Sequence, residues 1–138
     1  MDSTTLADSL AGANGFFLHF LAAVVLVALF CAIYVRITPY AEFALIREGK
    51  VAPSVSLSGA LLGFVIPLAS AISQSVSFVD MLVWAVIALL VQVLVFLLLR
   101  CCLAGLCREI AADRLAPAIL LGVLSLGAGI LSAACMTY

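Results

Sequence analysis

Four long stretches of this sequence contain no charged residue, and they limit the fold more than any other feature. They cover residues 15 to 35, 51 to 79, 81 to 99 and 115 to 138. Each has about the 20 residues that a helix needs to cross roughly 30 Å of hydrocarbon while its backbone hydrogen bonds stay internal. We therefore expect an all-α, polytopic membrane protein with spans at 16–35, 52–74, 80–99 and 116–136.

The composition points to the same class. Of the 138 residues, 67% are hydrophobic and only 9% are charged, which leaves too little polar surface for a protein dissolved in water. The expected partner of most of the surface is the lipid bilayer. We expect residues 1–138 to form a single membrane domain.

All the basic residues are expected to lie on one side of the membrane. All six lie between the first and second spans or between the third and fourth, namely Arg36, Arg47, Lys50, Arg100, Arg108 and Arg114. The positive-inside rule then places both basic loops in the cytoplasm and both termini on the outer side of the membrane. The first 15 residues contain Asp2 and Asp8 but no basic residue, so we expect the first span to be retained rather than cleaved as a signal peptide.

The chain also repeats itself. "KVAPSVSLSGALLGF" begins at residue 50, and "RLAPAILLGVLSLGA" begins 64 residues later, with a basic-x-Ala-Pro start in both copies. We interpret this as a two-helix hairpin used twice, at 11–74 and 75–138. Because each copy has an even number of spans, the two share one orientation and are related by an axis along the membrane normal.

Several of these residues resemble a known family. "TPYAEFALIREGKVA", followed by "SGALLGF", Asp80, Trp84 and Gln92, resembles the YjfL-type family of small bacterial inner-membrane proteins, a domain of unknown function. The resemblance covers roughly residues 16 to 136. It implies a four-helix protein of duplicated hairpins in a bacterial inner membrane, for which no reaction is established. The outer side of that membrane is the periplasm, so we expect both termini there.

Small side chains follow one face of the second and fourth expected spans. The candidate packing or oligomer face consists of Ser56, Gly59, Gly63, Pro67, Gly122, Ser125 and Gly129. Small residues allow two helices to approach closely, which matters in lipid because no hydrophobic force drives helix association there. Either both faces pack inside one bundle, which we favour, or one of them contacts a neighbouring subunit.

Three polar side chains lie within or beside the expected spans. Gln92 would make a hydrogen bond between helices or, alternatively, line a pore or contact a substrate. His19 and Asp80 are both near the outer ends of spans. We interpret them as interfacial and hydrated, and the alternative is a pair that titrates together.

Glu42 is the fourth candidate polar residue, in an otherwise apolar cytoplasmic segment. "TPYAEFALIREG" predicts a short helix, with Thr38 as its N-cap and Gly49 as the residue that ends it. A partly buried carboxylate needs a cation, which one of the arginines at 36, 47 and 100 would supply. We expect an ion pair that locks the loops, with a charged cytoplasmic mouth as the alternative. At the corresponding positions of the second copy stand Cys102 and Leu106, which suggests that the first segment has the specialised task.

The remaining chemistry argues against catalysis. Cys101, Cys102 and Cys107 have no C-x-x-C spacing and no nearby histidine, so we expect no metal site, and a reducing cytoplasm disfavours a disulfide. The sequence contains no nucleotide-binding loop and no catalytic Ser-His or Cys-His arrangement. We therefore expect no enzyme activity, no cofactor and no nucleic-acid partner.

Two membrane roles remain. We favour a small self-associating protein with a structural or interaction role in the envelope, which forms a homo-oligomer and docks an envelope-stress or other membrane-associated protein. The alternative is an oligomeric ion channel or transporter-like pore. Since the interior of a four-helix bundle is filled by side chains, such a pore would have to lie between protomers.

Overall fold

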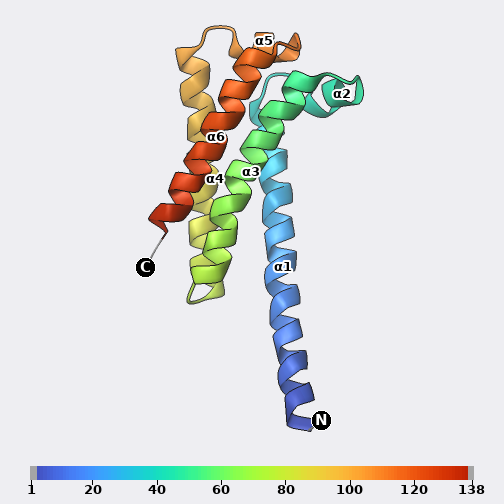
Figure 1. Cartoon of the computed structure of the whole chain (residues 1–138), viewed down its shortest axis with the longest axis vertical. Helices are drawn as coiled ribbons and strands as arrows, with labels where there is room; N and C mark the ends of the chain where they lie inside the picture. The colour runs from blue at the N-terminus through green and yellow to red at the C-terminus, as the bar shows by residue number, and fades with distance from the viewer. Residues whose placement is uncertain (1–2, 137–138) are drawn as a thin grey trace.

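The computed structural model describes residues 3 to 136, and all the secondary structure in that range is helical. The elements are α1 (Ser3–Ile37), α2 (Glu42–Arg47), α3 (Val51–Gln74), α4 (Phe78–Cys102), α5 (Leu106–Ala111) and α6 (Leu115–Cys135) (Figure 1). The predicted all-α fold class is confirmed.

Four of these helices, α1, α3, α4 and α6, are long and apolar enough to cross a membrane. Three of them begin and end within three residues of the predicted spans. The exception is α1, which begins at Ser3 rather than at residue 16. The apolar pattern marks only the part of a helix that suits lipid, and nothing in the first 15 residues stops the helix.

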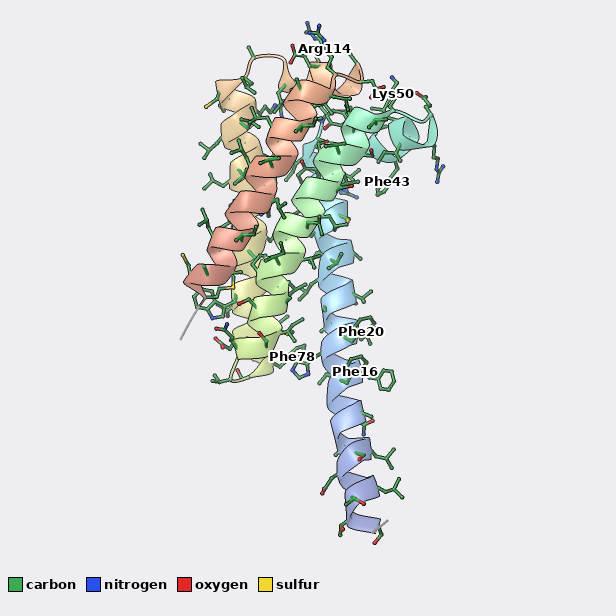
Figure 2. All side chains as sticks on the ribbon, in the orientation of Figure 1. Phe16, Phe20, Phe43, Lys50, Phe78 and Arg114 are labelled. Atoms are coloured by element: carbon green, nitrogen blue, oxygen red, sulfur yellow. The ribbon has the colours of Figure 1, made fainter. Side chains whose placement is uncertain are left out.

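The helices α3 and α6 form the centre of the molecule, and α4 packs against both of them. By contrast, α1 lies beside α3 and touches the others little, and its N-terminal half extends past their ends (Figure 1). Phe16 and Phe20 on this helix point away from the bundle (Figure 2) and are 62% and 58% exposed. The apolar surface of α1 is therefore left for lipid or for another protein.

The short helices α2 and α5 lie together at the end of the bundle opposite both termini (Figure 1). Lys50 and Arg114 are at this end as well (Figure 2). We call it the basic end, because all six lysine and arginine residues lie in or next to the segments that connect the long helices here.

The helix α2 ends in a Schellman motif. Gly49 has a φ of 85°, its N–H donates to the carbonyl of Ile46 (3.0 Å), and the N–H of Lys50 donates to the carbonyl of Leu45 (3.2 Å). Glycine suits this left-handed conformation because it has no Cβ. The predicted role of Gly49 as the residue that ends the helix is confirmed.

The helix α5 ends in the same way 64 residues later. Asp113 has a φ of 63°, its N–H donates to the carbonyl of Ile110 (3.0 Å), and the N–H of Arg114 donates to the carbonyl of Glu109 (3.0 Å). Aspartate is one of the few non-glycine residues that tolerate this backbone conformation.

The prediction that Thr38 caps the short helix was wrong. The N-cap residue of α2 is Ala41, which makes no side-chain capping bond. Thr38 instead continues the hydrogen bonding of α1, because its N–H donates to the carbonyl of Tyr34 and its hydroxyl donates to that of Val35. A threonine hydroxyl that bonds back to the preceding turn is not available to the next helix.

Candidate functional site

Glu42 is the most unusual residue of the basic end. Its side chain is fully buried, and neither carboxylate oxygen has a hydrogen-bond partner among residues 3 to 136. A buried carboxylate without a partner is costly, so such a group calls for an explanation.

The predicted ion pair of Glu42 with an arginine is not formed. The two ion pairs found at this end join Lys50 to Glu48 (4.0 Å) and Arg114 to Glu109 (3.6 Å). Glu42 is the first residue of α2 and faces the bundle, whereas the long arginine side chains at 36 and 47 are exposed. An exposed guanidinium group keeps its hydration shell and does not follow the carboxylate into the interior.

Other polar groups without partners surround Glu42. The hydroxyls of Tyr34 and Tyr40 are both buried and have no hydrogen-bond partner in the described part of the chain. Ser56 on α3 is buried too, and its hydroxyl donates to the carbonyl of Pro53 (3.0 Å). Tyr34 and Tyr40 both lie close enough to Glu42 to interact with its charge, and the Ser56 hydroxyl lies close to that of Tyr40. Helices α1, α2 and α3 thus each bring a polar side chain to one place, and we call Tyr34, Tyr40, Glu42 and Ser56 the polar cluster.

The environment changes the acidity of this cluster. Burial raises the pKa of Glu42 from 4.5 to about 7, and the nearby Tyr40 hydroxyl opposes that rise. Burial also raises the pKa of Tyr40 far above its usual range, and the negative charge of Glu42 adds to this. A carboxyl with a pKa near 7 carries a proton in a large fraction of molecules at neutral pH.

Gln92 connects the three central helices. Its side-chain nitrogen donates to the carbonyl of Gly63 on α3 (2.9 Å) and to that of Ser125 on α6 (3.0 Å). The side chain is 1% exposed, and its carbonyl oxygen has no partner among the described residues. This geometry is the interhelical hydrogen bond favoured from the sequence, and the amide faces the interior of the protomer.

The two faces of small residues lie against each other where α3 crosses α6. A Cβ added to Gly59 would lie 2.6 Å from the carbonyl oxygen of Gly122, and one added to Gly129 would lie 2.6 Å from the Cα of Gly63. Such distances leave no room for any side chain. The other small residues of these faces, Ser56, Pro67 and Ser125, are buried as well.

His19 and Asp80 each have local partners. The ring of His19 bonds through Nδ1 to the carbonyl of Gly15 (2.8 Å), and it packs edge-on against Phe78. Asp80 accepts a hydrogen bond from the N–H of Val76 (3.3 Å), and its own N–H donates to the hydroxyl of Ser77 (3.2 Å). The Ser77 hydroxyl thus caps the start of α4, and the Asp80 carboxylate reaches back one residue beyond this N-cap.

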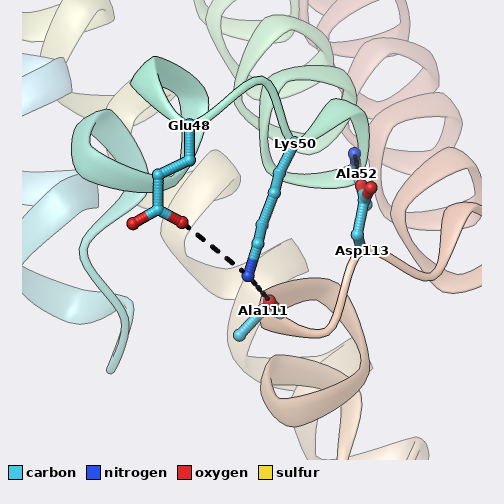
Figure 3. A network of polar contacts seen from close by, with 5 residues as sticks. All are labelled: Glu48, Lys50, Ala52, Ala111 and Asp113. Atoms are coloured by element: carbon cyan, nitrogen blue, oxygen red, sulfur yellow. Dashed lines mark hydrogen bonds and ion pairs between the residues drawn. The ribbon is translucent and has the colours of Figure 1, made fainter.

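A contact that the sequence patterns did not reveal joins the two halves at the basic end. The carboxylate of Asp113 accepts a hydrogen bond from the N–H of Ala52 at 2.8 Å, and the ammonium group of Lys50 donates to the carbonyl of Ala111 at 3.2 Å (Figure 3). The signal that could have found it is the alignment of Asp113 with Gly49, which places an aspartate where a glycine ends the first short helix.

All five cysteines are free thiols, and the described residues contain no group of three or more His, Cys, Asp or Glu side chains that could hold a metal ion. The Cys107 thiol lies near both Glu42 and Arg100. Burial raises its pKa, with a smaller opposing effect of the guanidinium group. A raised pKa lowers the thiolate fraction and with it the reactivity of the sulfur.

Four apolar helices, two of which cross at small residues and three of which are joined by one buried amide, define a polytopic, all-α membrane protein. The chain belongs to the family described as Domain of Unknown Function (DUF350), whose model matches residues 5–136. It is also 41% identical over 120 residues to the UPF0719 inner membrane protein YjfL of Escherichia coli (strain K12), a match that covers 87% of this chain and 91% of the relative. The same protein of Escherichia coli O157:H7 matches equally well.

No solved structure matches this chain. The resemblance to the YjfL-type family seen in the sequence is confirmed, and the chain is an inner-membrane protein of a family whose function is unknown.

Proposed function

We propose that this protein is a small self-associating module of the inner membrane, without a catalytic site, that has a structural or interaction role in the envelope. The observation that carries this proposal is the closed centre of the protomer. Glycine backbones of α3 and α6 meet there, and the Gln92 amide bonds to both helices. A bundle packed in this way has no hydrated path for an ion or solute.

In this proposal the basic end faces the cytoplasm, and the chain consists of two hairpins with the same orientation. The position of every lysine and arginine supports the orientation. The duplication is supported by two six-residue helices that lie 64 positions apart and end in left-handed residues, Gly49 and Asp113. The hydrogen bonds from Ala52 to Asp113 and from Lys50 to Ala111 then tie one hairpin to the other at the basic end.

The exposed face of α1 supports self-association. This helix makes few contacts with its own bundle, and the stacked rings of Phe16 and Phe20 project from it. A second copy that packs here would cover apolar surface without disturbing the centre. The basic end remains free to contact an envelope-stress or other membrane-associated protein.

The alternative function, an oligomeric pore, requires polar side chains on an axis between protomers. Glu42 and Gln92 are the residues best suited to line such a pore, and both are buried within one protomer. Their burial favours the non-transporting role.

Purified protein in nanodiscs and in liposomes tests the proposal. We expect native mass spectrometry to show a single oligomeric state with two or more copies of the chain. We expect the ion flux to equal that of empty liposomes. The double variant Phe16→Ala/Phe20→Ala should lower the oligomer fraction more than Leu90→Ala/Leu94→Ala, which truncates exposed residues of α4. A monomer at all concentrations would exclude self-association, and flux that depends on the protein would favour the pore.

A further inference from the structure

The polar cluster holds four of the buried side-chain oxygens that have no partner among residues 3 to 136. They are both carboxylate oxygens of Glu42 and the hydroxyl oxygens of Tyr34 and Tyr40. Buried polar atoms in native proteins are nearly always satisfied by protein, by water or by an ion. The Tyr40 hydroxyl lies near enough to Glu42 to act on its carboxyl. The two carboxylate oxygens can nevertheless accept more hydrogen bonds than the two tyrosine hydroxyls can donate, so the cluster has room for a further ligand.

The fold does not require polar residues here. Positions 64 residues later in the chain hold only apolar residues, namely Leu98, Ala104, Leu106 and Leu120. Leu106, which corresponds to Glu42, is 1% exposed in α5 and packs without any polar partner. A leucine thus suffices to hold a short helix against the bundle, so packing alone does not account for Glu42.

The charge of the cluster limits what can bind. A water molecule would satisfy the oxygens, but it would leave the buried charge of an ionised Glu42 uncompensated. At a pH above the pKa of Glu42, where the carboxylate is charged, the ligand must therefore be positively charged. One carboxylate among hydroxyl oxygens gives a net charge of −1 and a set of hard oxygen ligands, which suits a monovalent alkali cation better than Mg²⁺ or a transition metal.

The surroundings supply a route but no competing cation. Tyr40, a member of the cluster, also lines a surface recess of about 410 Å³ at the basic end, together with Arg100 and Arg108. Neither guanidinium group comes within 4.0 Å of Glu42. The recess therefore brings solvent close to Tyr40, while neither of its guanidinium groups is paired with Glu42.

We propose that Glu42, Tyr34, Tyr40 and Ser56 form a binding site for a monovalent alkali cation, Na⁺ or K⁺, which joins α1, α2 and α3 at the basic end. Such an ion would hold the short helix α2 in place through its charge. This inference does not depend on whether the protein associates with itself.

Thermal unfolding of the full chain in detergent at pH 8 tests the site, with the chloride salts of sodium, potassium, choline and magnesium at equal ionic strength. We expect Na⁺ or K⁺ to raise the Tm of the wild type by about 2–5 °C relative to choline, as expected for a ligand that binds only the folded state. Glu42→Gln should abolish this difference. Glu48→Gln, which removes an exposed carboxylate next to the same helix, should keep it.

Tyr34→Phe and Tyr40→Phe provide a second test, because each removes one hydroxyl while the ring that fills the space remains. We expect each to raise the alkali cation concentration needed for a given Tm shift by at least about threefold, which is the smaller end of what one lost ligand costs. Equal stabilisation of the wild type and Glu42→Gln would overturn the proposal. So would a Tm that is the same in sodium, potassium and choline, or a response to Mg²⁺ alone.

Discussion

The carboxylate of Asp113 lies 2.8 Å from the backbone nitrogen of Ala52, so a residue that ends α5 also caps the first turn of α3. The same residue adopts a left-handed backbone conformation, with a φ of 63°. It therefore satisfies a free N–H at a helix start and stays close to the positive end of the helix dipole. No equivalent bond can form in the reverse direction, because Gly49 has no side chain.

Substitutions at Asp113 should separate these two roles. Asp113→Asn retains an acceptor and tolerates the backbone, so we expect the smallest loss of stability. Asp113→Gly loses the cap but relaxes the backbone, and Asp113→Ala loses the cap and strains it. We expect the loss in the free energy of unfolding to increase from asparagine to glycine to alanine and to reach about 1 to 2 kcal/mol for alanine. Reversible unfolding in mixed micelles measures these losses. If Asp113→Ala were as stable as the wild type, the bond to Ala52 would have no energetic role.

The crossing of α3 and α6 should not tolerate a methyl group. Gly59→Ala places a Cβ against the backbone of Gly122, and we expect a loss of about 1 to 3 kcal/mol in the free energy of unfolding. Gly127→Ala is the matched control on α6, because nothing lies within 4 Å of its added Cβ. It should be neutral or stabilising, since alanine favours a helix more than glycine does. Similar losses in both variants would indicate that the helices do not cross at these residues.

Replacement of Gln92 distinguishes packing from conduction. Gln92→Leu removes two hydrogen bonds between helices, each worth about 0.6 kcal/mol in a membrane, and also removes a buried carbonyl oxygen that has no partner. We expect a net loss of about 1 kcal/mol or less in unfolding experiments and no change in liposome flux. A changed flux with unchanged stability would assign the amide to a pore.

The pH dependence of stability should depend on Glu42 when alkali cations are replaced by choline. The pKa of Glu42 is about 7 in the folded protein, against the usual 4.5. Between these values the unfolded chain releases a proton that the folded protein keeps, so stability falls as the pH rises through this window and stays low above it. The total loss should be on the order of 3 kcal/mol.

Glu42→Gln should remove most of this pH dependence and raise the Tm at pH 8. Glu48→Gln should leave the pH profile as in the wild type, because that side chain is exposed. Leu106→Ala tests the corresponding buried position of α5, and we expect a loss of about 2 to 5 kcal/mol that is the same at every pH. A Glu42→Gln profile that follows the wild type would assign the pH dependence to another group.

Accessibility labelling checks the proposed orientation. In a cysteine-free background, Ser9→Cys at the exposed start of α1 and Glu48→Cys at the basic end lie at opposite ends of the molecule. In cells whose outer membrane alone has been permeabilised, an impermeant maleimide should label Ser9→Cys. It should label Glu48→Cys only after the inner membrane is disrupted as well. The reverse pattern would place the basic end in the periplasm.

The membrane spans could be predicted because a charged residue is costly in hydrocarbon, so each span appears in the sequence as a long stretch without charge. The end of α2 at Gly49 could be predicted for a similar local reason, since glycine suits its backbone conformation. The start of α1 could not, because helix formation continues beyond the lipid and no residue there stops it. Sequence patterns thus predict the features of this fold that depend on interactions between residues close in the chain.

The partners of the side chains in the candidate site could not be predicted from such patterns. Glu42 is conspicuous in the sequence, and the assumption that it pairs with an arginine failed because the geometry of α2 turns it inward, away from the exposed guanidinium groups. The tyrosines beside it give no distinct signal in the sequence, because aromatic residues are common near a membrane surface. The bond between Asp113 and Ala52 joins residues 61 apart, so it depends on the packing of the short helices and not on any local pattern.

The 35 residues of α1 give a helix of about 52 Å, while the hydrocarbon layer is roughly 30 Å thick. With the apolar part immersed, the first dozen residues stand as a stiff rod that reaches about 20 Å into the aqueous compartment on the side of the termini. Any binding partner or reporter fused to this end would be held clear of the lipid headgroups at a defined distance.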